Sequence, residues 1–300
     1  MSILVVGSVA LDSVKTPAGK KEKILGGSAV YFSFIASFFA KVNLCGVIGR
    51  DFPRKYLNIL KAKNKIDLTG LQILPGKTFF WRGEYGPDFA DAKTLKTELN
   101  VFGNFKPVIP KEYKQSPFVF LANIDPDIQQ DILAQIKKPY FTAADTMNFW
   151  IEGKRKSLLK LLKKINLLFI NKSEAEMLTN RKNIFAMAEN ILKLGPETVV
   201  IKKGEEGSFM FSRRAYFYIP AFLLKDIKDP TGAGDSFAGG FMGYLAKTGK
   251  TTIKALKKAL VYGNIMASFT VEDFSIERLL KLDKKQINQR FKLFRKLLSF

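Results

Sequence analysis

The strongest constraint on the fold is an alternation of short apolar runs with segments of helical periodicity. The apolar runs lack strict polar–apolar alternation, as expected for parallel strands that are covered on both faces. We predict strands over residues 3–6, 42–48, 118–122, 140–143, 167–170 and 198–201. Helical patterns occur between and after them, at residues 28–40, 54–63, 128–137, 155–164, 184–194 and 233–246. The alternation predicts an α/β fold with a doubly wound, mostly parallel sheet flanked by helices, formed by residues 1–300 as one domain.

Two stretches interrupt this alternation, at residues 12–25 and 71–105. Neither has a helical period, but the second contains strand-like pieces at residues 77–85 and 95–102. We predict that the two stretches form a small β-sheet lid that stands off the core, with a long surface hairpin as the alternative. A lid of this kind would expose an apolar face, through which two copies of the chain would pair as a homodimer.

Residue types that are scarce or absent exclude several classes of function. The chain has no histidine, which excludes a Ser-His-Asp triad, an imidazole base and a His-ligated zinc. Its single cysteine, Cys45, cannot form an internal disulfide, which favours a reducing, cytoplasmic setting. The longest mostly apolar stretch, residues 29–40, is shorter than the about 20 residues of a membrane span. We therefore expect no membrane partner.

The chain is strongly basic, with a net charge of +22. Its lysines are spread over the whole length and do not cluster with arginine and aromatic residues, as they usually do in nucleic-acid-binding surfaces. General lysine richness therefore explains the charge better than a nucleic-acid partner does, although a small anion such as ATP would also benefit from it. Residues 275–300 predict an amphipathic helix packed on the core, with a membrane-surface role as the alternative.

The strongest chemical signal is the segment Asp229-Pro230-Thr231-Gly232-Ala233-Gly234-Asp235, which leads directly into a helical pattern. Glycines let a backbone approach a ligand closely, and the N–H groups of a helix N-terminus carry partial positive charge. The segment therefore predicts an anion cradle. Asp235 places a carboxylate beside this cradle; as a helix cap alone it would stabilise the helix by about 1 kcal/mol and have no other role.

This segment closely resembles the signature Asp-Thr-x-Gly-Ala-Gly-Asp of the ribokinase family of carbohydrate and nucleoside kinases, also called the PfkB family. Three shorter motifs of that family occur in the expected order. They are Gly26-Gly27-Ser28-Ala29, Asn171-Lys172-Ser173-Glu174 and Lys202-Lys203-Gly204-Glu205-Glu206-Gly207. The resemblance spans about residues 3–269, nearly the whole chain. Each short motif is weak alone, but their order and spacing together are typical of this family.

The resemblance implies a kinase that uses ATP and Mg²⁺. Asp235 would take the proton from the acceptor hydroxyl, and the backbone of Gly232, Ala233 and Gly234 would neutralise charge on the transferring phosphoryl group. Glu174 would hold Mg²⁺ through water molecules. The residues that would bind the nucleotide are Asn171, Lys202, Gly204, Gly207, Gly234 and Asn264.

The same resemblance places the acceptor beside Asp12, Gly26 and Gly27, together with Asp235. Asp229 and Thr231 match positions that bind a monovalent cation in some members, which adds K⁺ to the candidate cofactors.

Three of these residues also have simpler structural explanations. Asn171 fits a turn residue, Glu174 fits a charge in the first turn of a helix, and Asn264 fits a buried polar group within a helix.

The chain departs from the family pattern near the acceptor. Where many sugar kinases of this family have an asparagine, Tyr31 stands here, so a usual contact to a sugar hydroxyl is missing. Further aromatic residues make the expected entrance unusually aromatic: Phe32, Phe34, Phe79, Phe80, Trp81 and Tyr85. They would stack a base or another ring of the acceptor, or would form lid core. Asp145 resembles part of an Asp-x-Asn contact to substrate or metal with one residue too many, and we assign it no role.

We therefore predict phosphorylation of a hydroxymethyl group on a sugar or sugar-like small molecule, under a lid that excludes water. A nucleoside kinase is the alternative within the same class. From another class, a catalytically silent nucleotide- or polyanion-binding protein would use the same fold and the positive charge. The intact Asp235 argues against a silent protein, because such a protein has no need for the base.

Overall fold

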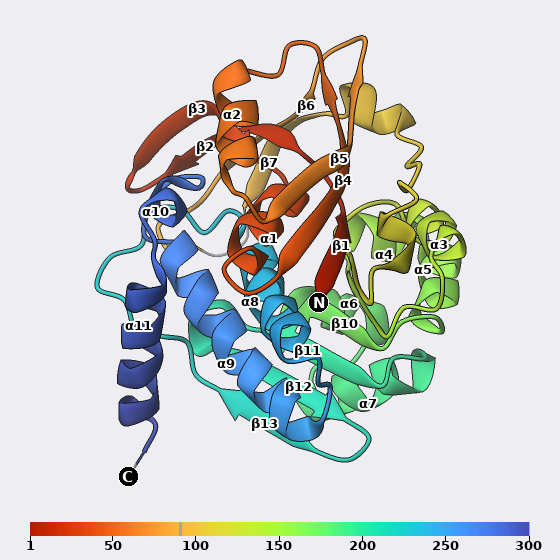
Figure 1. Ribbon diagram of the computed structural model, residues 1–300. Coiled ribbons are helices and arrows are strands. Elements are labelled where there is room, and N and C mark those ends of the chain that lie inside the picture. The colour runs from red at the N-terminus through yellow and green to blue at the C-terminus, as the bar shows by residue number, and fades with distance from the viewer. Residues whose placement is uncertain (90–91, 300) are drawn as a thin grey trace.

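A computed structural model describes residues 1–89 and 92–299 of the chain (Figure 1). In these residues the large sheet has nine strands, in the order β13-β12-β11-β10-β9-β8-β1-β4-β5. From β5 across to β11 the neighbouring strands are parallel, whereas β12 and β13 are antiparallel. The bounds are β1 Ser2–Val6, β4 Lys41–Gly49, β5 Ile66–Leu74, β8 Phe118–Leu121, β9 Phe141–Asp145, β10 Leu167–Asn171, β11 Thr198–Lys202, β12 Ser208–Ser212 and β13 Tyr216–Ile219.

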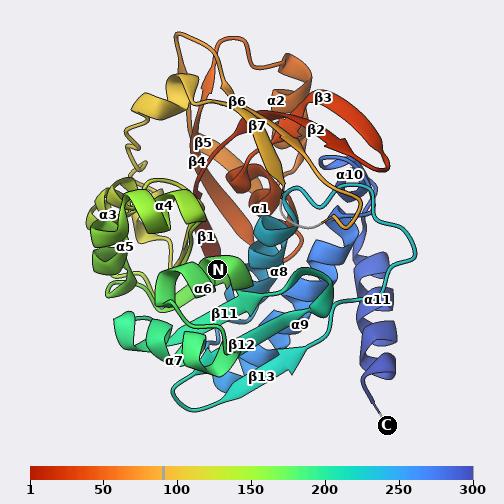
Figure 2. The same cartoon turned by 180° about the vertical axis from the view of Figure 1, so that it is seen from behind.

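Helices cover both faces of this sheet, which confirms the predicted fold class. Successive side chains of a strand point to opposite faces, and β1 accordingly sends Ile3 into one core cluster and Leu4 into the other. The first cluster is covered by α1 Ser28–Ala36, α2 Arg54–Ala62, α8 Ala233–Thr248, α9 Ile253–Thr270, α10 Glu277–Leu280 and α11 Lys284–Leu297. The second is covered by α3 Pro126–Gln135, α4 Asn148–Gly153, α5 Arg155–Leu162, α6 Lys172–Thr179 and α7 Ile184–Leu194, drawn in green in Figure 2.

The strand order reverses at β1, and this reversal marks where a ligand is expected. The chain first runs outward from β1 to β4 and β5, and then returns to β8 on the other side of β1. In open α/β sheets, ligands bind outside the carboxyl ends of the strands at such a point. Helix α8 packs against α1, β1 and β8, so its N-terminus belongs to this part of the molecule.

A second, smaller sheet lies at the top of Figure 1, in the order β3-β2-β6-β7. Its strands are β2 Ala10–Thr16, β3 Gly19–Gly26, β6 Phe79–Glu84 and β7 Lys93–Glu98. The predicted lid boundaries need one correction, because residues 71–74 continue β5 of the large sheet. A 3-10 turn, Asn100–Asn104, ends the second lid segment, and residues 90–91 of that segment lie outside the described residues.

The outer surface of this lid differs from the expected apolar face. The exposed positions of β3 are the charged residues 20–23 and Gly19. Strand β7 exposes residues 93–97, which are lysines and threonines except for Leu95. The expected apolar face is therefore wrong for these two strands.

Two predictions for the remaining elements also need correction. The helix expected over residues 275–300 is divided into α10 and α11, and Phe300 lies outside the described residues. The division occurs because Asp283 forms a capping box with Gln286 and starts a new helix there. The antiparallel hairpin of β12 and β13 was not predicted. Among the described residues, none of the helices combines the length and apolar character needed to cross a bilayer.

Candidate active site

The anion cradle forms as the sequence predicts, at the N-terminus of α8. Gly232 caps the helix with a left-handed backbone, at a φ of 77°. A Cβ atom built on Gly232 would lie 2.4 Å from the ring of Tyr31, so a side chain has no room there. The first N–H groups of a helix have no acceptor within the helix. In this first turn the Ala233 N–H donates to the carbonyl of Pro230 at 3.1 Å, so the N–H groups of Gly234 and Asp235 are the candidates for an anion. The turn can therefore receive an anion.

Asp235 has the electrostatic environment of a general base. Burial and the nearby Asp145, opposed by Lys202, together raise the pKa of its carboxyl group to about 7. A base with a pKa near the working pH combines a usable ionised fraction with sufficient proton affinity. The carboxylate stands in the same helical turn as the cradle, so one turn of α8 offers both an anion site and a base.

The acceptor side of the site is formed by Asp12, Gly26, Gly27 and Tyr31. Asp12 is only 4% exposed, and its carboxylate lies so close to Gly26 that a Cβ there would be 1.8 Å from Oδ2. Burial and the charges of Asp229 and Asp235, opposed by a hydrogen bond from the Gly27 backbone, together raise the pKa of Asp12 to about 8. The structure thus brings together the predicted acceptor residues Asp12, Gly26 and Gly27 with Asp235.

Tyr31 lies inside this acceptor side and not at its entrance. It is 1% exposed, and its hydroxyl group has no hydrogen-bond partner among the described residues. Burial raises the pKa of Tyr31 well above its usual value, and Asp229, Asp12, Tyr85 and Asp235 add to the effect. Phe32 and Phe34 are also buried, and Phe32 stacks on Phe120 of β8 with ring centres 4.3 Å apart. The predicted aromatic entrance is therefore wrong for Phe32 and Phe34, which belong to the core.

The lid contributes two aromatic residues that do lie at the site. Tyr85, just after β6, accepts a hydrogen bond from the Thr231 hydroxyl at 3.2 Å. Trp81 is opposite Asp12 in the register of β2 and β6, so the two side chains leave the sheet on the same face. The Trp81 indole N–H donates to Thr94 at 3.2 Å, and its ring lies over Gly83, where a Cβ would be 2.2 Å away. The lid thus rests on the cradle and holds one anchored ring beside Asp12.

The residues predicted for the phosphate side lie close to the ends of neighbouring strands: Asn171 ends β10, Lys202 ends β11, and Glu174 lies in the first turn of α6. Asp145, which ends β9, joins them. Asn171 and Glu174 form a capping box at the start of α6: the Asn171 side chain accepts from the Glu174 N–H at 2.7 Å, and the Glu174 side chain accepts from the Asn171 N–H at 2.8 Å. Glu174 is therefore a charge in the first turn of a helix, as its structural explanation states, whereas Asn171 is the N-cap of that helix and not a turn residue. Lys202 forms an ion pair with Asp145 at 3.0 Å.

The predicted nucleotide loop follows β11 as a tight turn. Gly204 and Gly207 both have left-handed φ values, of 54° and 98°, and a Cβ on Gly207 would lie 2.2 Å from the carbonyl oxygen of Ile219. Asn264 does not face open space. Its amide donates to the carbonyl of Pro220 at 3.0 Å and accepts from the Phe222 N–H at 2.9 Å. Asn264 thus holds the segment that follows β13, and any role toward adenine would act through that segment.

Asp229 and Thr231, the predicted monovalent-cation residues, lie behind the cradle. Asp229 is 1% exposed, burial raises its pKa, and its carboxylate accepts from the N–H groups of Thr231 at 2.9 Å and Ser275 at 3.5 Å. Lys228 donates to the backbone carbonyl of Val271 at 2.8 Å. The cradle is therefore tied to the segment that follows α9.

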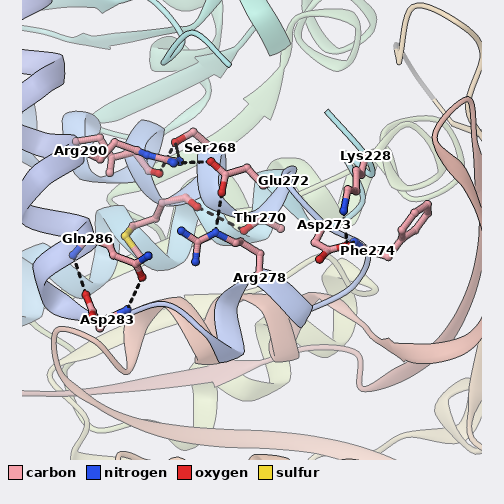
Figure 3. A network of polar contacts seen from close by, with 12 residues as sticks. Lys228, Ser268, Thr270, Glu272, Asp273, Phe274, Arg278, Asp283, Gln286 and Arg290 are labelled. Carbon is pink, nitrogen blue, oxygen red and sulfur yellow. Dashed lines mark hydrogen bonds and ion pairs between the residues drawn. The ribbon is translucent and has the colours of Figure 1, made fainter. Parts of the chain in front are cut away.

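A network of ion pairs fixes that segment in turn (Figure 3). Glu272 pairs with Arg278 at 2.7 Å and with Arg290 of α11, and the Arg290 guanidinium lies 3.5 Å from the centre of the Phe269 ring. Lys228 also pairs with Asp273 at 3.3 Å. The network connects α9, α10 and α11 to the residues just before the cradle.

Asp145 and the buried position of Tyr31 are the parts of the site that sequence reasoning missed. For Asp145 a signal existed, because a carboxylate ending a strand of a parallel sheet lies at the ligand-binding edge. For Tyr31, the helix is apolar on every side, which indicated a fully buried helix.

Comparisons with known proteins agree with this geometry. The pfkB family of carbohydrate kinases matches residues 3–278. The cytidine kinase of Thermococcus kodakarensis is 32% identical over 248 residues, which cover 81% of this chain and 87% of that protein.

Two solved structures share the fold. The nucleoside kinase of Methanocaldococcus jannaschii superposes with a TM-score of 0.77 at 21% identity, covering 97% of this chain and 98% of the other. The aminoimidazole riboside kinase of Salmonella enterica, solved with aminoimidazole riboside and an ATP analogue, has a TM-score of 0.76 at 16% identity, covering 97% and 100%. At these identities the two structures support the fold alone.

Proposed function

This chain belongs to the pfkB family of carbohydrate kinases, which phosphorylate an alcohol group, and from that premise we propose that its acceptor is the hydroxymethyl group of a nucleoside. The observation that carries the phosphoryl transfer to an alcohol is the position of Asp235. Its carboxylate stands in the first turn of α8, and it acts electrostatically both on Asp12 of the acceptor side and on Lys202 of the phosphate side.

The reaction then follows from these positions. The acceptor hydroxyl oxygen forms a bond to the γ-phosphorus of ATP, the bond to the bridging oxygen breaks, and ADP leaves. Asp235 accepts the hydroxyl proton, so the alcohol becomes a better nucleophile as the new bond forms. The N–H groups of Gly232 and Gly234 stabilise negative charge on the moving phosphoryl group, whereas the Ala233 N–H donates to the Pro230 carbonyl at 3.1 Å. Asp12 orients the acceptor by accepting hydrogen bonds from its other hydroxyl groups.

ATP and Mg²⁺ are the nucleotide and metal expected of this family, and the phosphate side fits them. Bound Mg²⁺ neutralises phosphate charge, and it usually takes one or two carboxylates together with waters and phosphate oxygens. Glu174 supplies such a carboxylate beside Lys202. The glycines of the nucleotide loop leave the backbone open, since a Cβ on Gly204 would meet nothing within 4 Å. Asn171 and Gly207 complete the proposed nucleotide site.

The proposal of a nucleoside, rather than a free sugar, has two supports. Trp81 presents an anchored ring on the same face of the lid as Asp12, where a base joined to the bound ribose would lie. The second support is the similarity to the cytidine kinase of Thermococcus kodakarensis.

The decisive experiment is a measurement of ADP release with a panel of nucleosides and sugars. We expect turnover with at least one nucleoside and a lower kcat/KM with every free sugar. Preference for a free sugar would instead support the broader prediction of a sugar kinase. Absence of turnover with all acceptors, together with measurable ATP binding, would support a silent nucleotide-binding protein.

We further propose that K⁺ binds beside Asp229 and Thr231 and orders the cradle. The support is a carboxylate that is buried behind the cradle and accepts hydrogen bonds from Thr231, through its side chain and backbone N–H, and from the Ser275 N–H. Replacing K⁺ by tetramethylammonium should lower kcat, and unchanged rates would contradict the proposal.

The homodimer through the lid and the cytoplasmic location stay predictions; light scattering of the purified protein tests the dimer.

A further inference from the structure

The ion pair of Lys202 and Asp145 lies where the transferred group would pass. Lys202 ends β11 and Asp145 ends β9, with β10 between them. The Lys202 ammonium group therefore reaches across the end of β10 to meet Asp145, at 3.0 Å. Both side chains are largely withdrawn from solvent, with 17% and 8% of their surface exposed.

The same ammonium group is a neighbour of the cradle. A Cβ atom built on Gly234 would lie 3.1 Å from Lys202 Nζ, and this nitrogen is the nearest atom that such a Cβ would meet. The glycine thus leaves the space that the ammonium group uses. An anion received by the first turn of α8 would arrive beside a full positive charge as well as beside backbone N–H groups.

The charge on Lys202 is maintained by its surroundings. Burial favours the neutral amine, but Asp145, Glu174 and Asp235 outweigh it, and the net effect raises the pKa of Lys202. An ammonium group has three donors, and Asp145 accepts from one of them. The same group can therefore donate to Asp145 and to a phosphate oxygen at once.

Fold stability alone is a weak reason for such a pair. Removing two charges from water costs several kcal/mol for each ion, and a well-packed apolar pair is often as stable. A buried cation beside an anion site has a clearer use in catalysis, where donors already in place stabilise the charge that develops on a transferring group.

We propose that Lys202 is a catalytic residue that contacts the phosphoryl group during transfer, and that Asp145 is a positioning residue that holds its ammonium group beside Gly234. The inference rests on the proposed kinase function and deepens it, because it names the cation that receives the γ-phosphoryl group. Glu174 would act on Mg²⁺, whereas Lys202 would act on the transferred group itself.

Binding measurements test this without turnover. Lys202→Met should weaken the binding of ATP more than the binding of ADP, because only ATP has the γ-phosphoryl group. The ratio of the two dissociation constants should change by about tenfold. Lys203→Met is the matched control: the neighbouring ammonium group pairs with Glu206 and lies 5.9 Å from the ring centre of Phe209. The control should leave the ratio unchanged. An unchanged ratio in Lys202→Met would overturn the proposal.

Kinetics separate the catalytic role from a structural one. Lys202→Met should lower kcat by about 10²- to 10³-fold, and Lys202→Arg should restore part of it. Asp145 raises the pKa of Asp235 and Lys202 lowers it. Asp145→Asn should therefore shift the acidic limb of the kcat–pH profile to lower pH, and Lys202→Met should shift it to higher pH. Asp12 and Tyr31, the other ionisable groups coupled to Asp235, are unchanged in both variants.

The outcomes distinguish this proposal from the proposed function. If the parent protein binds ATP and phosphorylates an acceptor but Lys202→Met keeps more than a third of kcat, the proposed function stands and the role of Lys202 is refuted. If the two variants lose thermal stability without opposite shifts of the pH profile, the pair only joins β9 to β11. A parent protein that binds no ATP would refute the proposed function itself.

Discussion

The two sides of the active site hold buried carboxylates in opposite ways. On the phosphate side, Asp145 is paired with the ammonium group of Lys202 at 3.0 Å. On the acceptor side, the charges that act most strongly on Asp12 are both negative, from Asp229 and Asp235, and its pKa rises to about 8. On the phosphate side, where an anion is expected, a cation thus stands beside the carboxyl group. On the acceptor side, where neutral hydroxyl groups are expected, the charged neighbours of the carboxyl group are negative.

This difference follows from the ligands that each side would receive. A phosphoryl group brings negative charge, so its site needs a cation and helix N–H groups in advance. A nucleoside brings neutral hydroxyl groups, which donate to a carboxylate and lower its cost of burial. The hydroxyl group of Tyr31, which has no hydrogen-bond partner among the described residues, is a second buried polar group on the acceptor side.

The largest effect should come from the residue between the two sides. Asp235→Asn keeps the size of the side chain, but its amide cannot take a proton. We expect kcat to fall by about 10²- to 10⁴-fold, the range that a general base contributes, with nearly unchanged ATP affinity and melting temperature. Purified Asp235→Asn protein that melts like the parent and keeps more than about a tenth of kcat would refute the assignment.

Asp12 tests the acceptor side alone. Asp12→Ala should raise the KM of the acceptor by about 10- to 100-fold, the value of a hydrogen bond to a charged group, and leave the KM of ATP nearly unchanged. Equal changes of both constants would show that Asp12 is only structural.

The same position links binding to stability. Asp12 has a pKa of about 8 in the fold against the ordinary 3.8, so the folded chain binds a proton that the unfolded chain has lost. Stability therefore falls as the pH rises through this interval. Asp12→Asn removes the buried charge and should raise the melting temperature at pH 8 by a few degrees, with a smaller gain at pH 5. An equal gain at both pH values would contradict the linkage.

The pH dependence of kcat should report Asp235. Its carboxylate is the active form, and its pKa is raised to about 7, so activity is lost as the pH falls through this value. We expect kcat to decrease about tenfold per pH unit well below pH 7, measured with saturating ATP and acceptor. A kcat that is flat from pH 8 to pH 5 would exclude proton transfer to a group with this pKa.

The two sides also differ in how far the sequence could predict them. The cradle is local: residues 229–235 carry its glycines, its base and the start of its helix in one segment, so the pattern alone located it. The acceptor side is assembled from β2, α1 and the lid. The hydrogen bond of Gly27 to Asp12 could be anticipated only through family resemblance, and the burial of Tyr31 depends on how α1 packs on α8.

Edge elements were missed for a related reason. The hairpin of β12 and β13 has strands of five and four residues, too short for a clear period, and its antiparallel pairing is decided by β11. The division of the last helix, in contrast, has a local signal in the sequence, because Asp283 and Gln286 have the spacing of a capping box.

The smallest effect concerns Glu174, which serves both as a helix cap and, in our proposal, as a Mg²⁺ residue. Glu174→Gln separates the two roles, because glutamine preserves a capping box but removes the charge. We expect an unchanged melting temperature and a Mg²⁺ requirement raised by about three- to tenfold, since one of the few carboxylates near the metal is lost. Asn171→Ala should instead lower the melting temperature, because loss of a helix cap costs about 0.5–2 kcal/mol of stability. Glu176→Gln, on the same helix, is the matched control. If Glu174→Gln left the Mg²⁺ requirement unchanged, Glu174 would be a cap alone, and the phosphate side would depend on Lys202 for its compensating charge.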